Sequence, residues 1–227
     1  TLGDNLIEAQ ALDNSNNPSS IQSIQVTYNA TLALVFAYNF NEGSGTIAND
    51  LSGNNYDGTI SGATWTTGRY GNALSFTGTG QQVSIPYVNL GNTVTYSTWF
   101  RKLGGSGCCG DPSDANLLSH AHNLIRVSNT QITWYWNTAG GSTTIPWGGD
   151  TNWHFLTITQ SNTVCNVYLD GNIILANGCG SAINTISGIQ TLGNFQGWSW
   201  NGLIDEVRIY NRALSQTEIV NDMNTPI

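Results

Sequence analysis

Two carboxylates interrupt an apolar segment near the end of the sequence. Asp205 and Glu206 lie within residues 202–210, which otherwise follow the pattern of a buried strand. Carboxylates are disfavoured in strands, and burying one without a partner costs free energy. Successive side chains point to opposite faces of a strand, so Glu206 is expected to be solvated or paired with Arg208 or Arg212. The sequence predicts that a specific partner holds Asp205.

Tryptophan is the second residue type with useful chemistry, and the chain contains eight. Residues 131–136 alternate, which places Trp134 and Trp136 on one face of a predicted strand and Tyr135 on the other. An exposed indole ring stacks on the apolar face of a sugar ring, and polar neighbours bind the hydroxyl groups. Burial in the core is the alternative fate of each indole. The candidate sugar-binding residues are Trp134, Trp136, Trp198, His120 and Arg126.

The four cysteines are Cys108, Cys109, Cys165 and Cys179, and none has the spacing of a zinc site. An even count in a β-rich chain favours disulfides and an oxidising compartment. Three pairings are possible. A predicted hairpin over residues 164–176 places Cys165 opposite Ala176, so a Cys165–Cys179 bridge requires the chain to bend back after residues 177–178. We favour that bridge, with Cys108 and Cys109 joined to each other or pairing separately.

Composition excludes several function classes. The net charge is -8, with only six basic residues and 9% charged residues in total. Nucleic-acid binding needs clustered lysine and arginine, so this class is disfavoured, as is docking on anionic membranes. No apolar run approaches the ~20 residues of a membrane span, and no signal peptide opens the chain. We expect a mature or excised fragment of an extracellular or cell-surface protein.

Short strands separated by glycine-rich turns predict an all-β fold with two antiparallel sheets. Only residues 214–223 show a helical pattern, and Ser215 with Glu218 forms a capping box that starts the helix. The predicted strands are residues 34–40, 73–76, 82–85, 94–101, 123–127, 131–136, 154–160, 164–170, 172–176, 189–192 and 202–210.

The N-terminal residues differ from the rest. Residues 5–13 and 21–28 each alternate at period two around a polar break, which predicts a β-hairpin. A lone hairpin is barely stable in water. The segment resembles the last strands of a bacterial immunoglobulin-like repeat. We therefore divide the chain into a hairpin segment, residues 1–30, and a main domain, residues 31–227.

Seven motifs of the main domain follow one order: residues 40–45, 49–58, 71–76, 94–99, 153–156, 168–171 and 202–215. Together they resemble the laminin-G-like jelly roll of the concanavalin A-like lectin/glucanase superfamily. The resemblance implies two stacked antiparallel sheets, with the first and last strands adjacent on the convex side.

The resemblance also implies a partner for Asp205. Related folds hold a structural calcium ion where the loop after the first strand meets the last strand. Calcium takes six to eight oxygen ligands from carboxylates, amides and carbonyls. The predicted ligand residues are Asp205, Asn41, Glu42, Asp50 and Asn54. Hydrogen bonds to backbone amides are the alternative role of Asp205, and turn formation is the alternative role of Asp50 and Asn54.

The sequence favours a binding module over an enzyme. Glucanases of the superfamily carry an E-x-D-x-x-E motif on a concave strand, which this chain lacks, and the residues of an alginate-lyase site cannot be assembled. We expect a calcium-stabilised lectin-like module that binds a glycan or polysaccharide and contacts other domains of a larger secreted chain. The alternative is a structural or adhesive module that packs on neighbouring subunits. Residues 111–116 crowd oxygens into a long loop, either as a solvated loop or as a rim of the ligand site.

Overall fold

The computed structural model describes residues 5–9, 22–26, 33–106, 113–120, 123–136, 141–183, 188 and 190–227. The chain divides into two compact units, Thr1–Ala33 and Leu34–Ile227. In the first unit, β1 (Asn5–Ala9) pairs antiparallel with β2 (Gln22–Val26), as the period-two patterns predict. Its origin in an immunoglobulin-like repeat stays a prediction.

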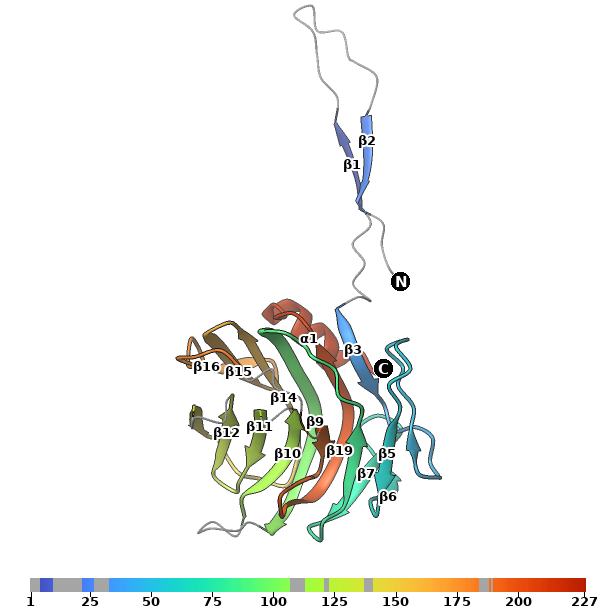
Figure 1. Ribbon diagram of the computed structural model, residues 1–227, viewed down its shortest axis with the longest axis vertical. Helices are drawn as coiled ribbons and strands as arrows, with labels where there is room; N and C mark the ends of the chain where they lie inside the picture. The colour runs from blue at the N-terminus through green and yellow to red at the C-terminus, as the bar shows by residue number, and fades with distance from the viewer. Residues whose placement is uncertain are drawn as a thin grey trace, which may run out of the picture. The chain divides into compact units, whose positions relative to one another are not determined.

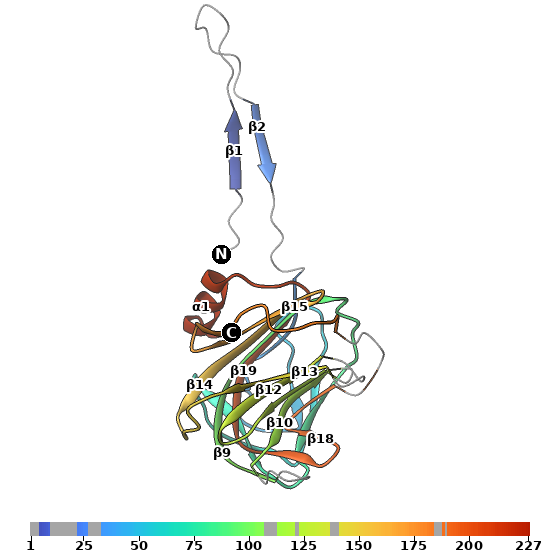
Figure 2. The ribbon, with the colours of Figure 1, turned by 90° about the vertical axis from the view of Figure 1, so that its left-hand side faces the viewer.

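The second unit is a jelly-roll sandwich of two antiparallel sheets (Figures 1 and 2). The 8-stranded sheet has the order β13 (Ser142–Pro146), β12 (Gln131–Tyr135), β11 (Asn123–Val127), β10 (Ala115–His120), β17 (Gln190–Leu192), β8 (Gln82–Ile85), β5 (Gly58–Ser61) and β4 (Ile47–Ala48). The 9-stranded sheet has the order β16 (Asn172–Leu175), β15 (Val164–Leu169), β14 (Trp153–Ser161), β9 (Thr93–Ser106), β19 (Trp198–Tyr210), β7 (Asn72–Thr77) and β6 (Thr64–Thr67). Two further strands, β3 (Leu34–Tyr38) and β18 (Asn194–Phe195), also pair with β19.

The first and last strands of this unit are neighbours, as the resemblance implies. Val207 of β19 lies opposite Tyr38 of β3 in an antiparallel ladder. The ladder between β19 and β9 slips between Asp205 and Arg208, where Glu206 adopts a positive φ of 53°. Such a β-bulge re-aims side chains, and here it interrupts the simple alternation of the strand.

The core lies between the two sheets because each strand turns its apolar residues inward. Ile125 and Val127 of β11 and Ile132 of β12 are buried. Tyr96 of β9 and Trp134 of β12 come from opposite sheets, and their ring centroids are 5.5 Å apart. The contact joins the two layers across the core.

The helix α1 (Gln216–Asn224) starts as predicted. The Ser215 hydroxyl accepts from the backbone N–H of Glu218, and the Glu218 carboxylate accepts from the backbone N–H of Ser215. These bonds satisfy N–H groups that a helix start leaves unpaired. The helix lies at the end of the sandwich opposite β18 (Figure 2).

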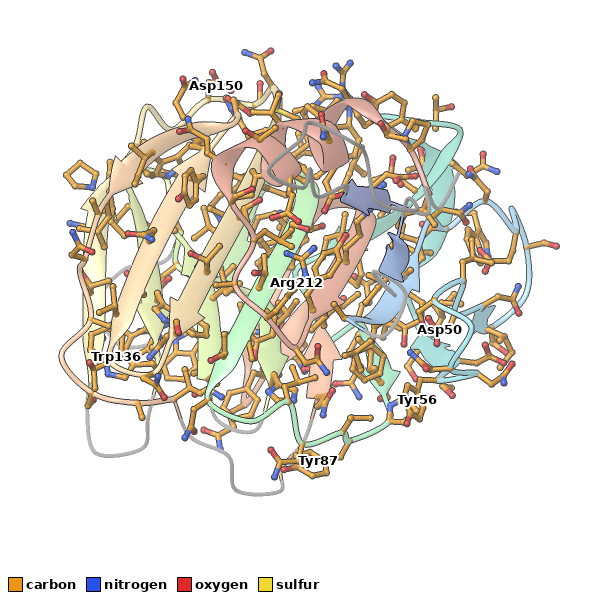
Figure 3. The ribbon with its side chains drawn as sticks, turned by 90° about the horizontal axis from the view of Figure 1, so that it is seen from above. Asp50, Tyr56, Tyr87, Trp136, Asp150 and Arg212 are labelled. Atoms are coloured by element: carbon orange, nitrogen blue, oxygen red, sulfur yellow. A yellow bond between two sulfur atoms is a disulfide. The ribbon has the colours of Figure 1, made fainter. Side chains whose placement is uncertain are left out.

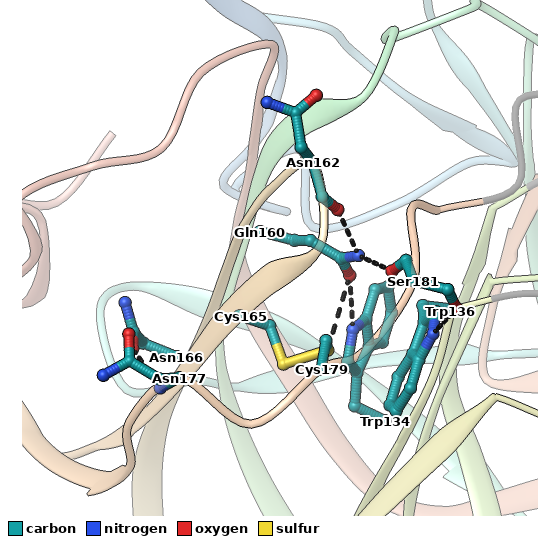
Figure 4. Close-up of a disulfide and its surroundings, with 9 residues drawn as sticks. All are labelled: Trp134, Trp136, Gln160, Asn162, Cys165, Asn166, Asn177, Cys179 and Ser181. Carbon is teal, nitrogen blue, oxygen red and sulfur yellow. Dashed lines mark hydrogen bonds between the residues drawn. A yellow bond between two sulfur atoms is a disulfide. The ribbon is translucent and has the colours of Figure 1, made fainter.

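The predicted Cys165–Cys179 disulfide is present (Figure 4). The chain bends after β16, where Asn177 has a φ of 56° and the N–H of Gly178 donates to the carbonyl of Cys165. This bend brings the two cysteine Cα atoms within 5.2 Å of each other. Cys108 and Cys109 lie outside the described residues, so their pairing stays a prediction.

Candidate functional site

The outer face of the 8-stranded sheet carries very little charge. Arg126 is the only lysine, arginine, aspartate or glutamate in its eight strands. Alternation along β11 buries Ile125 and Val127, so Arg126 points away from the core. In the ladder Arg126 lies opposite Thr133 of β12 and Asn116 of β10.

The guanidinium of Arg126 contacts two aromatic rings. Its central carbon is 4.4 Å from the ring centroid of Tyr135 and 4.3 Å from that of Trp198. One terminal nitrogen donates to the Tyr135 hydroxyl, and the other lies 3.1 Å from the Asp114 carboxylate. Rings at these distances attract the cation through their π electrons. We call Asp114, Asn116, Arg126, Tyr135 and Trp198 the Arg126 cluster.

Several polar atoms of this cluster lack a partner. Asn116 is fully buried, and neither its amide oxygen nor its amide nitrogen has a hydrogen bond within the part of the chain that the structure describes. The same holds for the Nε of Arg126 and the indole nitrogen of Trp198. Buried polar groups are nearly always paired, and an unpaired one costs about 1–3 kcal/mol. The cluster therefore has unused hydrogen-bonding capacity beside two aromatic rings.

The structure corrects two of the predicted sugar-binding tryptophans. Trp134 and Trp136 share a face as expected, but that face is the core, where both side chains are buried. The indole of Trp134 donates to Gln160 at 2.9 Å, and that of Trp136 donates to the Ser181 hydroxyl at 2.7 Å (Figure 4). Neither ring can stack on a sugar from this position. Tyr135, between them, is the residue that reaches the outer face.

His120 is a core residue as well, which contradicts its predicted role as a sugar contact. Its Nε2 bonds to the Val88 carbonyl at 2.9 Å, and its Nδ1 lies 3.0 Å from the Tyr96 hydroxyl. A carbonyl can only accept, so Nε2 carries the hydrogen and Nδ1 accepts. Burial lowers the pKa of His120, against a backbone hydrogen bond that raises it. Burial thus favours the neutral imidazole, which is part of the core.

Of the predicted sugar-binding residues, Arg126 and Trp198 lie together at the surface. The sequence analysis missed Tyr135, because the alternation of residues 131–136 does not say which face is buried. It placed Asp114 and Asn116 in a loop that could rim the ligand site, and both lie in the cluster. In the structure Asn116 belongs to β10, a strand that the sequence analysis did not predict.

Asp205 is held by the turn that precedes β7. Its Oδ2 accepts from the backbone N–H groups of Arg69 at 2.8 Å and Tyr70 at 3.0 Å. A Cβ on Gly68 would come within 2.6 Å of that oxygen, so glycine lets the turn approach this closely. The other oxygen, Oδ1, is buried and has no hydrogen bond from any described residue. Half of the carboxylate is thus satisfied and half is not.

The environment of Asp205 disfavours its charge. The pKa of Asp205 is raised to about 7, mainly by burial; the N–H groups of Tyr70 and Arg69 act against this rise and the Glu206 carboxylate adds to it. A nearby cation would favour the ionised form.

Two of the other predicted calcium ligands lie near the same turn. Asn41 accepts through Oδ1 from the N–H of Asn72 at 2.7 Å. Glu42 accepts through Oε1 from the N–H of Asn49 at 2.6 Å. Its Oε2 is buried and has no partner in the described chain. Like Asp205, Glu42 has one carboxylate oxygen that no described residue pairs.

Asp50 lies at the side of the sandwich away from Trp136 (Figure 3), where it and Asn54 instead organise a turn. Both oxygens of Asp50 are occupied, because they accept from the N–H groups of Ala37, Ser52 and Tyr56 and from the Ser52 hydroxyl. The amide nitrogen of Asn54 donates to two carbonyls of β3. These contacts correspond to the alternative role given to both residues. They remove the support for placing Asp50 in a calcium site.

Glu206 was expected to be solvated or paired with Arg208 or Arg212; it is buried, and of these alternatives the structure shows the pair with Arg208. Its Oε2 accepts from Arg208 at 3.2 Å, which is the predicted pair, and from the N–H of Ile227 at 2.7 Å. Burial raises the pKa of Glu206, and the N–H of Ile227 and the Arg208 charge lower it.

Within the described residues, no group of three or more histidine, cysteine, aspartate or glutamate side chains could hold a metal ion. A calcium site here must therefore draw on amide and carbonyl oxygens as well.

A family model of the laminin-G type, described as the concanavalin A-like lectin/glucanases superfamily, matches residues 77–220. The chain belongs to this superfamily. The resemblance that the motifs carry is thereby confirmed. No curated protein sequence gives a significant match to the chain.

Solved structures with the same fold include domain 4 of AbnA, a GH43 extracellular arabinanase from Geobacillus stearothermophilus, in complex with arabinotriose. It is 19% identical, with a TM-score of 0.67, over 84% of this chain and 98% of that one. The binding domain of Paraclostridial Mosquitocidal Protein 1 is 18% identical, with a TM-score of 0.66, over 86% of this chain and 52% of that one. Trypanosoma rangeli sialidase in complex with the inhibitor DANA is 16% identical, with a TM-score of 0.61, over 84% of this chain and 32% of that one. At these identities the likeness shows the fold.

Two observations bear on location. The disulfide and the lectin-like fold fit an extracellular protein. None of the helices in the described residues is long and apolar enough to cross a membrane.

Proposed function

We propose that the chain is a non-catalytic carbohydrate-binding module that binds a glycan at the Arg126 cluster and is stabilised by calcium at Asp205. One observation carries the glycan site: the guanidinium of Arg126, the single lysine, arginine, aspartate or glutamate side chain in the eight strands of its sheet, contacts the rings of Tyr135 and Trp198. Beside this contact the Asn116 amide, Arg126 Nε and the Trp198 indole nitrogen have no hydrogen bond from any described residue. Sugar hydroxyl groups both donate and accept, and sugar C–H faces pack on aromatic rings.

The comparisons support this function without identifying the ligand. The arabinanase domain of the same fold was solved with arabinotriose, and the mosquitocidal protein contributes a binding domain. For this chain, binding rather than catalysis is favoured by charge. Glycoside hydrolysis uses two carboxylates that flank the scissile bond. The eight described strands of the sheet contain no carboxylate, and Asp114 beside them is paired with Arg126.

The calcium proposal rests on the oxygens that lack partners. Asp205 Oδ1 and Glu42 Oε2 are both buried without a hydrogen bond in the described chain. Their residues border the same turn, because Asp205 binds the N–H groups of Arg69 and Tyr70 while Asn41, next to Glu42, binds that of Asn72. Asp205, Glu42 and Asn41 are the proposed ligand residues. The ion would tie the loop after β3 to β19.

The glycan proposal is tested with a tryptophan pair. Trp198→Ala is expected to lower glycan affinity at least about tenfold while the fold persists. The matched control is Trp65→Ala. Trp65 is also partly exposed, but it lies on β6 in the 9-stranded sheet, where its indole donates to the carbonyl of Gly45. The control should bind as the unaltered protein does. Equal binding by both variants contradicts the proposed site.

The structural or adhesive alternative stays a prediction, and no contact of the described residues favours it over glycan binding. Its predicted partners, neighbouring subunits and other domains of a longer chain, are likewise untested.

A further inference from the structure

We infer that Asp114 makes the glycan site selective for neutral sugars, because it cancels the charge of Arg126. The inference rests on the proposed glycan-binding function and concerns the charge class of the ligand. It starts from the observation that Arg126 is the only permanently charged residue in the eight strands of the sheet. Whatever charge a ligand meets on this face is therefore decided by Arg126 and its partner.

Without Asp114, this face would suit an acidic sugar. A guanidinium group binds a carboxylate through two parallel N–H groups, and Arg126 is held in place between the Tyr135 and Trp198 rings. A uronic acid would find a preorganised cation here. The surrounding strands offer no second positive charge to compensate for a loss of this one.

Asp114 occupies that position instead. Its carboxylate lies 3.1 Å from one terminal nitrogen of Arg126, and the side chains are only 19% and 12% exposed. At this depth the solvent screens the pair less than it screens a surface pair. The other terminal nitrogen donates to the Tyr135 hydroxyl. Both terminal nitrogens are engaged, so an incoming carboxylate must displace Asp114 or lie beside its negative charge.

Four polar atoms of the cluster, all shielded from solvent, have no hydrogen bond from any described residue, and their chemistry suits hydroxyl groups. They are the Nε of Arg126, the indole nitrogen of Trp198 and both polar atoms of the Asn116 amide. These atoms are three nitrogen donors and one oxygen acceptor. They do not include two parallel N–H groups of one charged side chain, which is the arrangement that binds a carboxylate. Neighbouring hydroxyl groups of a neutral sugar can donate to the Asn116 oxygen and accept from the others. The chain's net charge of -8 adds a general repulsion of acidic polymers.

The test uses a glycan array that carries neutral oligosaccharides beside their uronic-acid counterparts. The unaltered protein is expected to bind neutral members. Asp114→Asn keeps the shape of the side chain, removes its charge, and should shift the affinity ratio toward uronic-acid members at least about tenfold. Asp114→Glu should keep the neutral preference. Asp150→Asn removes one negative charge from a separate cluster beside His154 and controls for net charge.

The outcomes separate this inference from the proposed function. Absence of binding to every array member contradicts the proposed function and removes the basis of the inference. Binding of uronic-acid members by the unaltered protein overturns the inference alone. A folded Asp114→Asn variant that keeps the original ratio, or loses all binding, also overturns it, since Asp114 then does not act through its charge.

A measurement on the unaltered protein covers the case in which Asp114→Asn does not fold. Binding of a neutral array member should be nearly independent of sodium chloride, and an excess of oligogalacturonate should not compete. Strong salt dependence, or competition by oligogalacturonate, overturns the inference.

Discussion

The Asp205 region and the Arg126 cluster both contain buried polar atoms without partners, but the two sets differ chemically. In the Asp205 region the atoms without a partner among the described residues include two carboxylate oxygens, Asp205 Oδ1 and Glu42 Oε2. In the Arg126 cluster they are three nitrogen donors and one amide oxygen. Carboxylate oxygens suit a cation, whereas a mixture of amide, guanidinium and indole groups beside aromatic rings suits hydroxyl groups.

The difference also separates stability from recognition. Asp205 connects β19 to the turn before β7. A cation bound there would therefore affect how firmly the turn is joined to the strand. Arg126, at the centre of the Arg126 cluster, points to the outer face of the 8-stranded sheet, away from the core. Variants in one region should therefore change stability, and variants in the other should change binding.

The largest expected effect comes from Asp205→Ala. The change leaves the N–H groups of Arg69 and Tyr70 without their acceptor. Each unpaired buried group costs about 1–3 kcal/mol, so the free energy of unfolding should fall by about 2–6 kcal/mol. Chemical denaturation in the presence of a chelator, which excludes any contribution of calcium, measures the loss. Asp205→Asn is the control, because it keeps an acceptor oxygen, and it should be much milder. Equal losses in both variants would show that the negative charge, and not the acceptor, stabilises the turn.

The second effect is the response to chelation. If calcium binds at Asp205 and Glu42, its removal at neutral pH should lower the free energy of unfolding by about 3 kcal/mol when the ion is present at a hundredfold excess over its Kd. Calorimetry with and without a chelator measures this. Asp205→Asn and Glu42→Gln should reduce the response, and Asp50→Asn should not. An unchanged melting temperature on chelation makes the calcium proposal wrong.

A smaller effect of opposite sign is expected in the Arg126 cluster. Asn116→Leu replaces an unpartnered buried amide with an apolar side chain, so stability should rise by about 1 kcal/mol while glycan affinity falls. Asn123→Leu is the matched control, because Asn123 is equally buried but has an interaction of its own. That variant should lose stability. A clear loss of stability in Asn116→Leu would show that the amide is satisfied within the protein, and the two regions would then no longer be comparable.

Alternation predicted strands but not which face of each strand is buried. The pattern Trp134-Tyr135-Trp136 separates two faces correctly, and it contains aromatic residues on both. Only the packing of Trp134 against Tyr96 of the other sheet decides that the tryptophans face inward. A period of two shows which residues share a face of the strand, but it does not show which of the two faces is buried. Short threonine- and glycine-rich strands such as β5 and β6 gave no pattern at all.

The sequence marked Asp205 as anomalous without identifying its partner. Its hydrogen-bond donors are the backbone N–H groups of Arg69 and Tyr70. Every residue except proline has such a group, so the sequence does not show which one will donate. The disulfide was more accessible to sequence reasoning, because Asn177-Gly178 marks the bend that joins Cys165 to Cys179, although the slip of the hairpin register between Val167 and Tyr168 was not predicted. Contacts between side chains that are close in sequence could be predicted, and contacts made by a distant backbone could not.

The smallest expected effect comes from a cluster whose polar groups have partners. His154 lies 2.8 Å from the Asp170 carboxylate and 2.9 Å from that of Asp150. Burial lowers the pKa of His154, but the hydrogen bonds and charges of Asp170 and Asp150 outweigh it and raise the value overall. Because the folded pKa lies above the unfolded one, the stabilisation is complete below pH ~6.5 and is lost as the pH rises through the folded pKa.

His154→Gln should remove this pH dependence at a loss of no more than about 1 kcal/mol at low pH, since the partners are exposed to solvent. Melting temperatures of both proteins between pH 5 and 9 measure it. The variant should respond to chelation and bind glycans as the unaltered protein does, because the polar side chains around His154 already have partners within the protein. A change in either response would mean that unpartnered atoms do not by themselves mark the two sites, and the distinction between them would have to rest on position in the fold.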